Sequence, residues 1–258
     1  MGRGRWLSCC WLGLALVHSA TGAAPPAATV PETATSWYGD MAAARAFMVD
    51  AARAYELRRR APVTVKALGT MSALEAVARG QADLVGSARP ADPGTPLERN
   101  LQFTTVAWDA LALLVHPRNP VKNLSLEQLR DVFAGRISDW SALGGKPGKI
   151  NVYAVAGPLD GVEWSLRRVL FGKGSSQVAA RRWYINTQQL EDAIAIDPAA
   201  IGVSLNSLVA GKPTLGVLAI DGVAPSLATL EDGRYVLPTR LYVAARREAP
   251  GAPSTVQV

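Results

Sequence analysis

Strand-like and helix-like segments alternate along this sequence, and few folds accommodate that order. The segment Val63–Leu68 reads VTVKAL, with β-branched residues that are typical of a strand. Residues 41 to about 57 instead carry apolar side chains at the spacing of one helix face. Such alternation predicts an α/β fold, with a largely parallel sheet and helices on both of its faces. By the same criteria we expect strands at 35–38, 82–86, 108–116, 150–155, 201–205, 215–220 and 235–244, and helices at 72–80, 125–135, 160–171 and 188–196.

Polar residues at the start of three expected helices have the spacing of a capping box, in which two side chains bind free backbone N–H groups. The pairs are Ser72 with Glu75, Ser125 with Gln128, and Asp160 with Glu163. Gly135 is expected to end the second of these helices. Asp40 precedes the first helix of the chain, and aspartate is one of the preferred residues at that position.

Residues 1–23 have the layout of a secretory signal peptide, with two arginines, an apolar run at 6–17 and small residues before Ala24. The run is too short to span a bilayer. Cys9 and Cys10 lie in the middle of the run and not at its end, which favours a cleaved signal over a lipoprotein signal. We therefore expect export to the periplasm, with a linker at 24–34 after the signal and a disordered tail at 248–258.

After cleavage of such a signal, the chain would have little of what most catalytic sites need. Both cysteines would be lost, so neither a thiol nucleophile nor a Cys/His zinc site is expected. The remaining histidine, His116, precedes Pro117 and is expected in a turn, without a nucleophile beside it. We expect no catalytic residues, no metal and no cofactor. Basic and acidic residues alternate along the chain, so nucleic acid is not expected as a partner.

Four stretches of the sequence resemble one protein family in their order and spacing. They are 63–90, which reads VTVKALGTMSALEAVARGQADLVGSARP, then 106–145, 198–205 and 217–243. Together they are similar to the periplasmic phosphate-binding proteins, the substrate-binding components of phosphate ABC transporters. The resemblance implies a type II periplasmic binding protein fold, an α/β fold in which two lobes are joined by two crossing strands. It implies that 35–113 with 213–247 form lobe 1 and that 114–212 form lobe 2.

The resemblance also implies a function, namely the capture of phosphate or another small oxyanion between the two lobes for an ABC-type uptake system. The implied partners are this small-molecule ligand and a membrane permease, and the protein is expected to be a monomer. A second hypothesis belongs to another class of protein. The same fold with a degraded or altered pocket would serve as a periplasmic interaction or sensory module.

In this family an oxyanion lies where several helix N-termini converge, because their free N–H groups and positive dipole ends favour a negative charge. Hydroxyl groups and an arginine add further hydrogen bonds. The resemblance places the ligand-binding residues in four turns of this chain. They are Asp40 and Met41, Thr70 and Ser72, Ser87 and Arg89, and Asp160, Gly161 and Val162.

Three positions depart from the pattern of the family. Asp40-Met41 stands where the family shows Ser-Thr, Asp160-Gly161-Val162 stands where it shows Ser-Gly-Thr, and Ala156 stands where it has an arginine. At an effective dielectric constant of about 20, a carboxylate about 4 Å from a phosphate repels each unit of its charge by roughly 4 kcal/mol. These departures therefore make ordinary phosphate binding less favourable.

Each of these residues has a structural alternative to a ligand contact. Asp40 and Asp160 either cap their own helices or contact a cationic or hydroxyl-rich ligand. Arg89 either holds an anion in the cleft or forms a salt bridge on the loop surface. Thr70 and Ser87 each have either a ligand contact or a structural role, and the sequence favours neither. Ser72 is expected mainly as a helix cap.

Overall fold

The computed structural model describes residues 34–157 and 159–247. The expected signal peptide at 1–23, nearly all of the linker at 24–34, and the tail at 248–258 lie outside these residues. Within the described ranges, none of the helices combines the length and the hydropathy that crossing a membrane requires.

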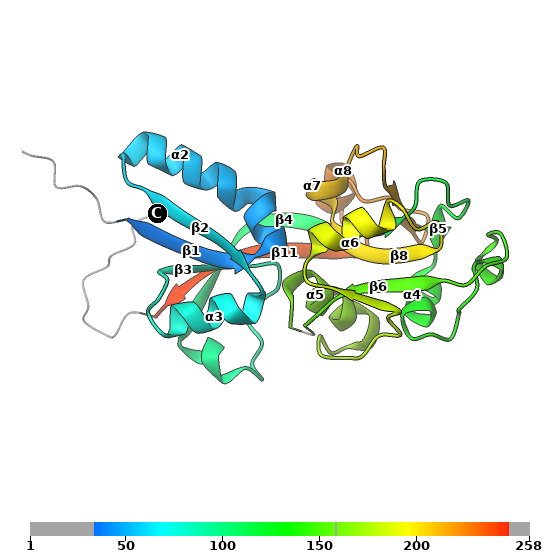
Figure 1. Ribbon diagram of the computed structural model, residues 1–258, viewed down its shortest axis with the longest axis horizontal. Coiled ribbons are helices and arrows are strands. Elements are labelled where there is room, and N and C mark those ends of the chain that lie inside the picture. The colour runs from blue at the N-terminus through cyan, green and yellow to red at the C-terminus, as the bar shows by residue number, and fades with distance from the viewer. Residues whose placement is uncertain (1–33, 158, 248–258) are drawn as a thin grey trace, which may run out of the picture. The chain divides into compact units, whose positions relative to one another are not determined.

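Strands and helices alternate through the described chain, as the sequence predicts (Figure 1). The strands are β1 Thr35–Asp40, β2 Val63–Leu68, β3 Leu84–Ser87, β4 Leu101–Val115, β5 Asn123–Leu124, β6 Asn151–Val155, β7 Arg182–Tyr184, β8 Ala200–Leu205, β9 Gly216–Val217, β10 Ala219–Ile220 and β11 Pro238–Arg246. The α-helices are α1 Met41–Ala43, α2 Val49–Arg59, α3 Thr70–Ala78, α4 Leu126–Phe133, α5 Gly161–Phe171, α6 Thr187–Ile194, α7 Asn206–Val209 and α8 Leu227–Glu231. A π-helical segment, η1 Ala44–Met48, joins α1 to α2, and two short 3-10 helices are η2 Pro96–Asn100 and η3 Trp140–Leu143.

The main sheet has the order β2-β1-β3-β11-β4-β8-β6-β7, and β9 pairs separately with β4. Its outer strands are parallel, since β1 pairs in parallel with β2 and β3, and β6 with β7 and β8. The central strands β4 and β11 run antiparallel to their neighbours. The sheet is therefore mixed and not largely parallel, because two long strands cross its middle in opposite directions.

Strand β4 divides the sheet into two regions (Figure 1). Its first part, 101–110, pairs with β11, and its last part, 111–115, pairs with β8. We call β2, β1, β3, β11 and the first part of β4 the first sheet region, and the remaining strands of this sheet the second sheet region. The two long strands β4 and β11 correspond to the crossing strands that the resemblance implied.

Strand β4 begins seven residues before the strand expected at 108–116. Residues 110–115 are all buried, and this continuous apolar run is the part that the sequence pattern predicted. Most side chains between Gln102 and Trp108 are exposed or half-buried. Backbone pairing with β11 holds the early part of the strand in place. Its side chains are largely uncovered, so the sequence shows no strong apolar pattern there.

Local signals predicted one helix start correctly and another wrongly. Ser125 and Gln128 form the expected capping box, with reciprocal hydrogen bonds of 3.0 and 2.8 Å. At α3, however, the expected capping box of Ser72 and Glu75 is absent. The helix begins two residues earlier at Thr70, after an extended Gly69 at the N-cap, so Ser72 lies inside the first turn with an exposed side chain.

A buried tryptophan determines the shape of the chain at the ends of β1 and β3. Trp37 is fully buried, and its ring lies against the backbone of Gly39 and Gly86. A Cβ atom at Gly86 would lie 1.8 Å from Trp37 Cζ2, and one at Gly39 would lie 2.3 Å from Cη2. Both positions therefore require glycine, and the turns that follow them are held in place by the indole ring.

Candidate functional site

Several turns that the sequence singled out meet at one edge of the first sheet region. Strands β1, β2 and β3 are parallel, so their carboxyl ends lie at the same edge. Asp40 ends β1, Thr70 follows β2, and Ser87 ends β3. The start of α5 at Gly161 lies against this edge, because a hydrogen bond joins its backbone to Thr70.

The carboxylate of Asp40 lies at the centre of this meeting point. Its side chain is almost fully buried, with 1% exposed. Oδ1 accepts a hydrogen bond of 2.6 Å from the backbone N–H of Ala43, so Asp40 caps α1 as one of the two alternatives predicted. Oδ2 accepts bonds of 2.8 Å from the Ala88 N–H and 3.4 Å from the Thr70 hydroxyl. Asp40 therefore joins the starts of two helices to the turn after β3.

Thr70 and Gly161 connect the two sheet regions at the same point. The Thr70 hydroxyl, itself buried, accepts a hydrogen bond of 3.1 Å from the Gly161 N–H. A Cβ atom at Gly161 would lie 2.6 Å from Asp40 Oδ2 and 2.7 Å from the Ala88 nitrogen. Only glycine permits this approach. Nearby, the Ser165 hydroxyl donates a bond of 2.9 Å to the Ala88 carbonyl.

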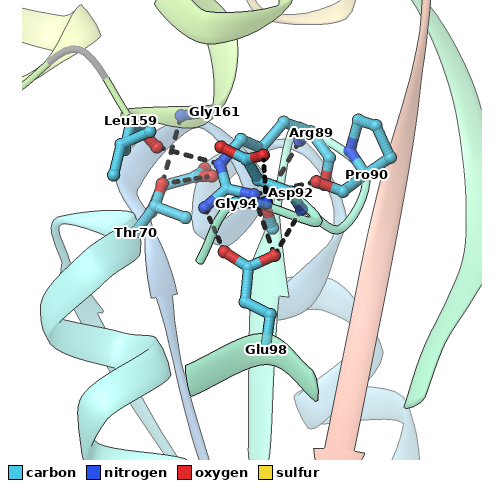
Figure 2. A network of polar contacts seen from close by, with 10 residues as sticks. Thr70, Arg89, Pro90, Asp92, Gly94, Glu98, Leu159 and Gly161 are labelled. Atoms are coloured by element: carbon cyan, nitrogen blue, oxygen red, sulfur yellow. Dashed lines mark hydrogen bonds and ion pairs between the residues drawn. The ribbon is translucent and has the colours of Figure 1, made fainter. Parts of the chain in front are cut away.

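Arg89 is fully engaged by the protein, as Figure 2 shows. Its guanidinium forms two hydrogen bonds with the Glu98 carboxylate, at 2.7 and 3.2 Å, and both side chains are buried. Its Nε donates a bond of 3.0 Å to the Leu159 carbonyl. Of the two alternatives for Arg89, the salt bridge is the one present. It lies in the interior and not on the loop surface, because η2 brings Glu98 underneath the turn.

The remaining predicted site residues do not meet at the Asp40 carboxylate. The Ser87 hydroxyl forms bonds of 3.0 and 3.1 Å with the backbone of Arg89, which close its own turn. Val162 is fully buried in the main hydrophobic core. Met41 is half-buried and lines a neighbouring pocket.

Asp160 occupies the N-cap position of α5, but the reciprocal capping box predicted with Glu163 is absent, so that prediction is wrong. Glu163 is fully buried and is used elsewhere. Its carboxylate accepts bonds of 3.0 Å from the Val155 N–H and 3.1 Å from the Arg167 guanidinium. The half-buried Asp160 side chain is left facing the neighbouring pocket.

Two aspartates at this site have unfavourable surroundings for their charges. Burial raises the pKa of Asp40 above its usual range, although hydrogen bonds from two backbone amides and a hydroxyl oppose the shift. Burial raises the pKa of Asp160 well above its usual range, and the charges of Asp40 and Glu163 add to the effect. The two aspartates therefore resist being ionised together.

A pocket of about 260 Å³ adjoins Asp160 and lies between residues of both sheet regions. The first region contributes Met41, Ala42, Ala67, Leu68 and Gly69, and the second contributes Asp160, Ile185, Asn186 and Thr187. Sequence reasoning missed Ile185 and Thr187. The N-cap residue Asn186, which accepts a bond of 3.0 Å from the Gln189 N–H, is a local signal that marks the start of α6 at this point.

Comparison with known proteins places the chain in a family. A family model described as a PBP superfamily domain matches residues 41–256. The phosphate-binding protein PstS of Bacillus subtilis (strain 168) is 28% identical over 193 residues, which are 74% of this chain and 63% of that protein. The match therefore spans less than two thirds of that relative's length.

Solved structures show the same fold. A putative phosphate ABC transporter substrate-binding protein with bound phosphate from Clostridium perfringens has a TM-score of 0.76 and 19% identity, and the match covers 83% of this chain and 86% of that one. An ABC-type phosphate transport receptor from Vibrio cholerae has a TM-score of 0.67 and 20% identity, with 86% and 89% covered. The predicted periplasmic binding protein fold is confirmed, and the chain belongs to the PBP superfamily.

Proposed function

We propose that this chain is an exported solute-binding protein of an ABC-type uptake system, which closes around a small solute and presents it to a membrane permease. The observation that carries the proposal is that the starts of α1, α3 and α5 meet around Asp40: its carboxylate accepts the N–H groups of Ala43 and Ala88, and beside it the Gly161 N–H donates to the Thr70 hydroxyl. Such a convergence is the means by which proteins hold small anions. The relatives named as phosphate-binding proteins support the same function.

The proposal includes a division into lobes, with 35–113 and 213–247 in one and 114–212 in the other. The long strand β4 supports it, since it pairs with β11 in the first sheet region and with β8 in the second. A monomer that is exported by a cleaved signal peptide is part of the same proposal.

Binding is proposed in place of catalysis. The one histidine among the described residues, His116, accepts a bond of 3.1 Å at Nδ1 from the Arg118 N–H, within a turn. The Nδ1 atom of this histidine is therefore not free to take a proton from a nucleophile.

Phosphate is the first ligand to test, because it names the relatives and because the helix starts favour an anion. We propose that the Asp40 carboxylate occupies the position of the oxyanion, here called the anion position, because it accepts hydrogen bonds from the Ala43 and Ala88 N–H groups. Phosphate binding therefore requires Asp40 to leave this position or to lose its charge.

That occupancy favours a second function, an interaction or sensory module of the same fold. Arg89 is neutralised by Glu98, and Val162 lies in the core, so neither offers a group to an anion. In a module of this kind the site would hold the two sheet regions together without a solute.

Thermal unfolding of the mature protein with phosphate, sulfate, amines and sugars tests both functions. A ligand at 100 times its dissociation constant stabilises by about 2.7 kcal/mol. For a chain of this size we expect a rise in Tm of roughly 5–10 °C with the cognate solute. A rise with any of these solutes supports the binding protein, whereas no rise with all of them supports the module.

A further inference from the structure

The groups that would hold an oxyanion are already used by the chain itself. The Ala88 N–H donates to Asp40 Oδ2, and the Gly161 N–H donates to the Thr70 hydroxyl. Atoms pack so closely here that a single Cβ atom at Gly161 would overlap the Asp40 carboxylate. A ligand cannot reach these N–H groups unless it displaces the Asp40 carboxylate. A ligand that leaves Asp40 in place must therefore bind at another site.

Asp40 and Asp160 have no salt bridge to a basic side chain among the described residues. The two arginines that act electrostatically on these carboxylates are each paired with another buried acid. Arg89 Nη2 lies 2.7 Å from Glu98 Oε1, and Arg167 Nη2 lies 3.1 Å from Glu163 Oε2. No lysine or arginine lines the pocket beside Asp160. A cation beside Asp160 would lower the pKa of this carboxyl and favour its charged form, whereas an anion would raise the pKa further.

Thr187 provides an independent indication of a ligand in the same pocket. Its side chain is 98% buried, since only 2% is exposed, and it lines the pocket at the start of α6. Its hydroxyl is one of two buried side-chain polar atoms without a hydrogen-bond partner among the described residues. A buried hydroxyl is almost always hydrogen-bonded in a native protein, so a bound molecule is expected to supply the partner.

The walls of the pocket are apolar and partly uncovered. Leu68 has 38% of its surface exposed and Ile185 has 76%. A hydrocarbon group lying on these side chains would remove apolar surface from water. The pocket is also smaller than the roughly 300–1,000 Å³ typical of drug-sized ligands, so its occupant is small.

We propose that this pocket is the solute site of the protein and that it binds a small organic ammonium ion. The ammonium group donates hydrogen bonds to the Asp160 carboxylate and to the Thr187 hydroxyl, while its carbon chain lies on Leu68 and Ile185. The Asp40 carboxylate stays in the anion position, where it accepts the hydrogen bonds that a bound oxyanion would otherwise accept. The proposal rests on the proposed function, because it assigns the chemical class of the solute for the same cleft.

Isothermal titration of the mature protein at pH 7 tests the proposal. The probes are n-butylamine and ethanolamine, with n-butanol as the neutral counterpart and inorganic phosphate as the anion. We expect at least one amine to bind at least tenfold more tightly than n-butanol, because an ammonium forms charge-assisted hydrogen bonds. We expect no binding of phosphate.

Two substitutions locate the bound amine. Asp160→Asn removes the charge and should weaken the amine about tenfold or more, and Thr187→Val should weaken it roughly threefold to tenfold. Because the Thr187 hydroxyl has no partner in the protein, Thr187→Val should leave the Tm without ligand unchanged or raise it. Asp192→Asn and Thr64→Val, at exposed positions, are the matched controls.

The outcomes separate this inference from the function on which it rests. Amine binding that Asp160→Asn leaves unchanged would overturn the assignment of the pocket. Binding of phosphate without binding of either amine would overturn the solute class and leave the binding-protein function in place. If amines, phosphate, sulfate and sugars all fail to bind, the inference and the proposed function fail together.

Discussion

The Asp40 carboxylate lies 2.8 Å from the backbone nitrogen of Ala88, a residue 48 positions away in the chain. This bond joins the start of α1 to the turn after β3, at the anion position that we propose. A side chain of the protein therefore supplies the negative charge that the surrounding N–H groups favour.

Asp40→Ser should open the anion position. Serine also caps helices, so α1 should persist, whereas the Ala88 N–H loses its buried partner. We expect the variant without ligand to be about 1–3 kcal/mol less stable than the wild type and to regain stability with millimolar phosphate. Thermal unfolding with and without phosphate measures both effects. Asp50→Ser on the exposed face of α2 is the control, and an Asp40→Ser protein indifferent to phosphate would contradict the prediction.

Asp160→Asn should stabilise the protein at neutral pH. The pKa of Asp160 is raised in the folded state, so the folded protein retains a proton that the unfolded chain releases. The favourable contribution of this proton is complete below the usual carboxyl pKa, near 3.9, and is lost as the pH rises through the raised value. Ionising Asp160 at pH 7 therefore lowers the free energy of unfolding of the wild type, a penalty that Asp160→Asn does not have.

Urea unfolding between pH 4 and 8 measures this penalty. The advantage of Asp160→Asn over the wild type should be largest at pH 7 and should shrink as the pH falls towards 4. An advantage that does not change with pH would show that it has another cause. Asp192→Asn again provides the exposed control.

Arg89 and Glu98 should depend on each other strongly. Both are buried and joined by two hydrogen bonds, so removing one leaves the other charge without a partner. We expect Arg89→Met and Glu98→Leu to cost about 3–5 kcal/mol each, and the double variant to cost much less than their sum. Urea unfolding of the four proteins in this cycle gives the coupling energy. Additive losses would mean that the two side chains act independently.

Gly161→Ala should push α5 away from Asp40. The added Cβ would lie 2.6 Å from Asp40 Oδ2, and relief of that overlap is expected to cost about 1–3 kcal/mol. Combining it with Asp40→Ser should recover part of the loss, because the overlapping oxygen is gone. Gly148→Ala, where a Cβ would meet nothing within 4 Å, is the control. Equal losses from Gly161→Ala in both backgrounds would contradict the predicted contact.

Much of the fold could be predicted because its signals are local. The β-branched run at Val63–Leu68 forms β2 with the predicted bounds. The capping box of Ser125 and Gln128 lies within four residues, so it can be recognised without knowledge of the rest of the chain. The same reasoning found Asp40 as a cap, since Ala43 is only three residues away.

The local signals failed where a partner distant in the chain competed for the same group. Asp160 and Glu163 have the spacing of a capping box, but Glu163 pairs with Arg167 and with the Val155 N–H from β6. At α3 the failure has a local cause. Gly69 is the extended N-cap residue and the helix begins at Thr70, so Ser72 lies inside the first turn and cannot cap it. A spacing rule describes what a side chain can reach within one helix turn and is silent on tertiary partners.

The sequence by itself determined the α/β alternation and offered the capping role of Asp40 as one of two alternatives, because residues close together in the chain decide both. Only the tertiary structure decided that the second oxygen of Asp40 accepts the Ala88 N–H and that Glu98 pairs with Arg89. It also decided that Thr187 and Asp160 face the same pocket. These contacts join residues on different strands and helices, and their energies depend on the burial that the folded chain creates.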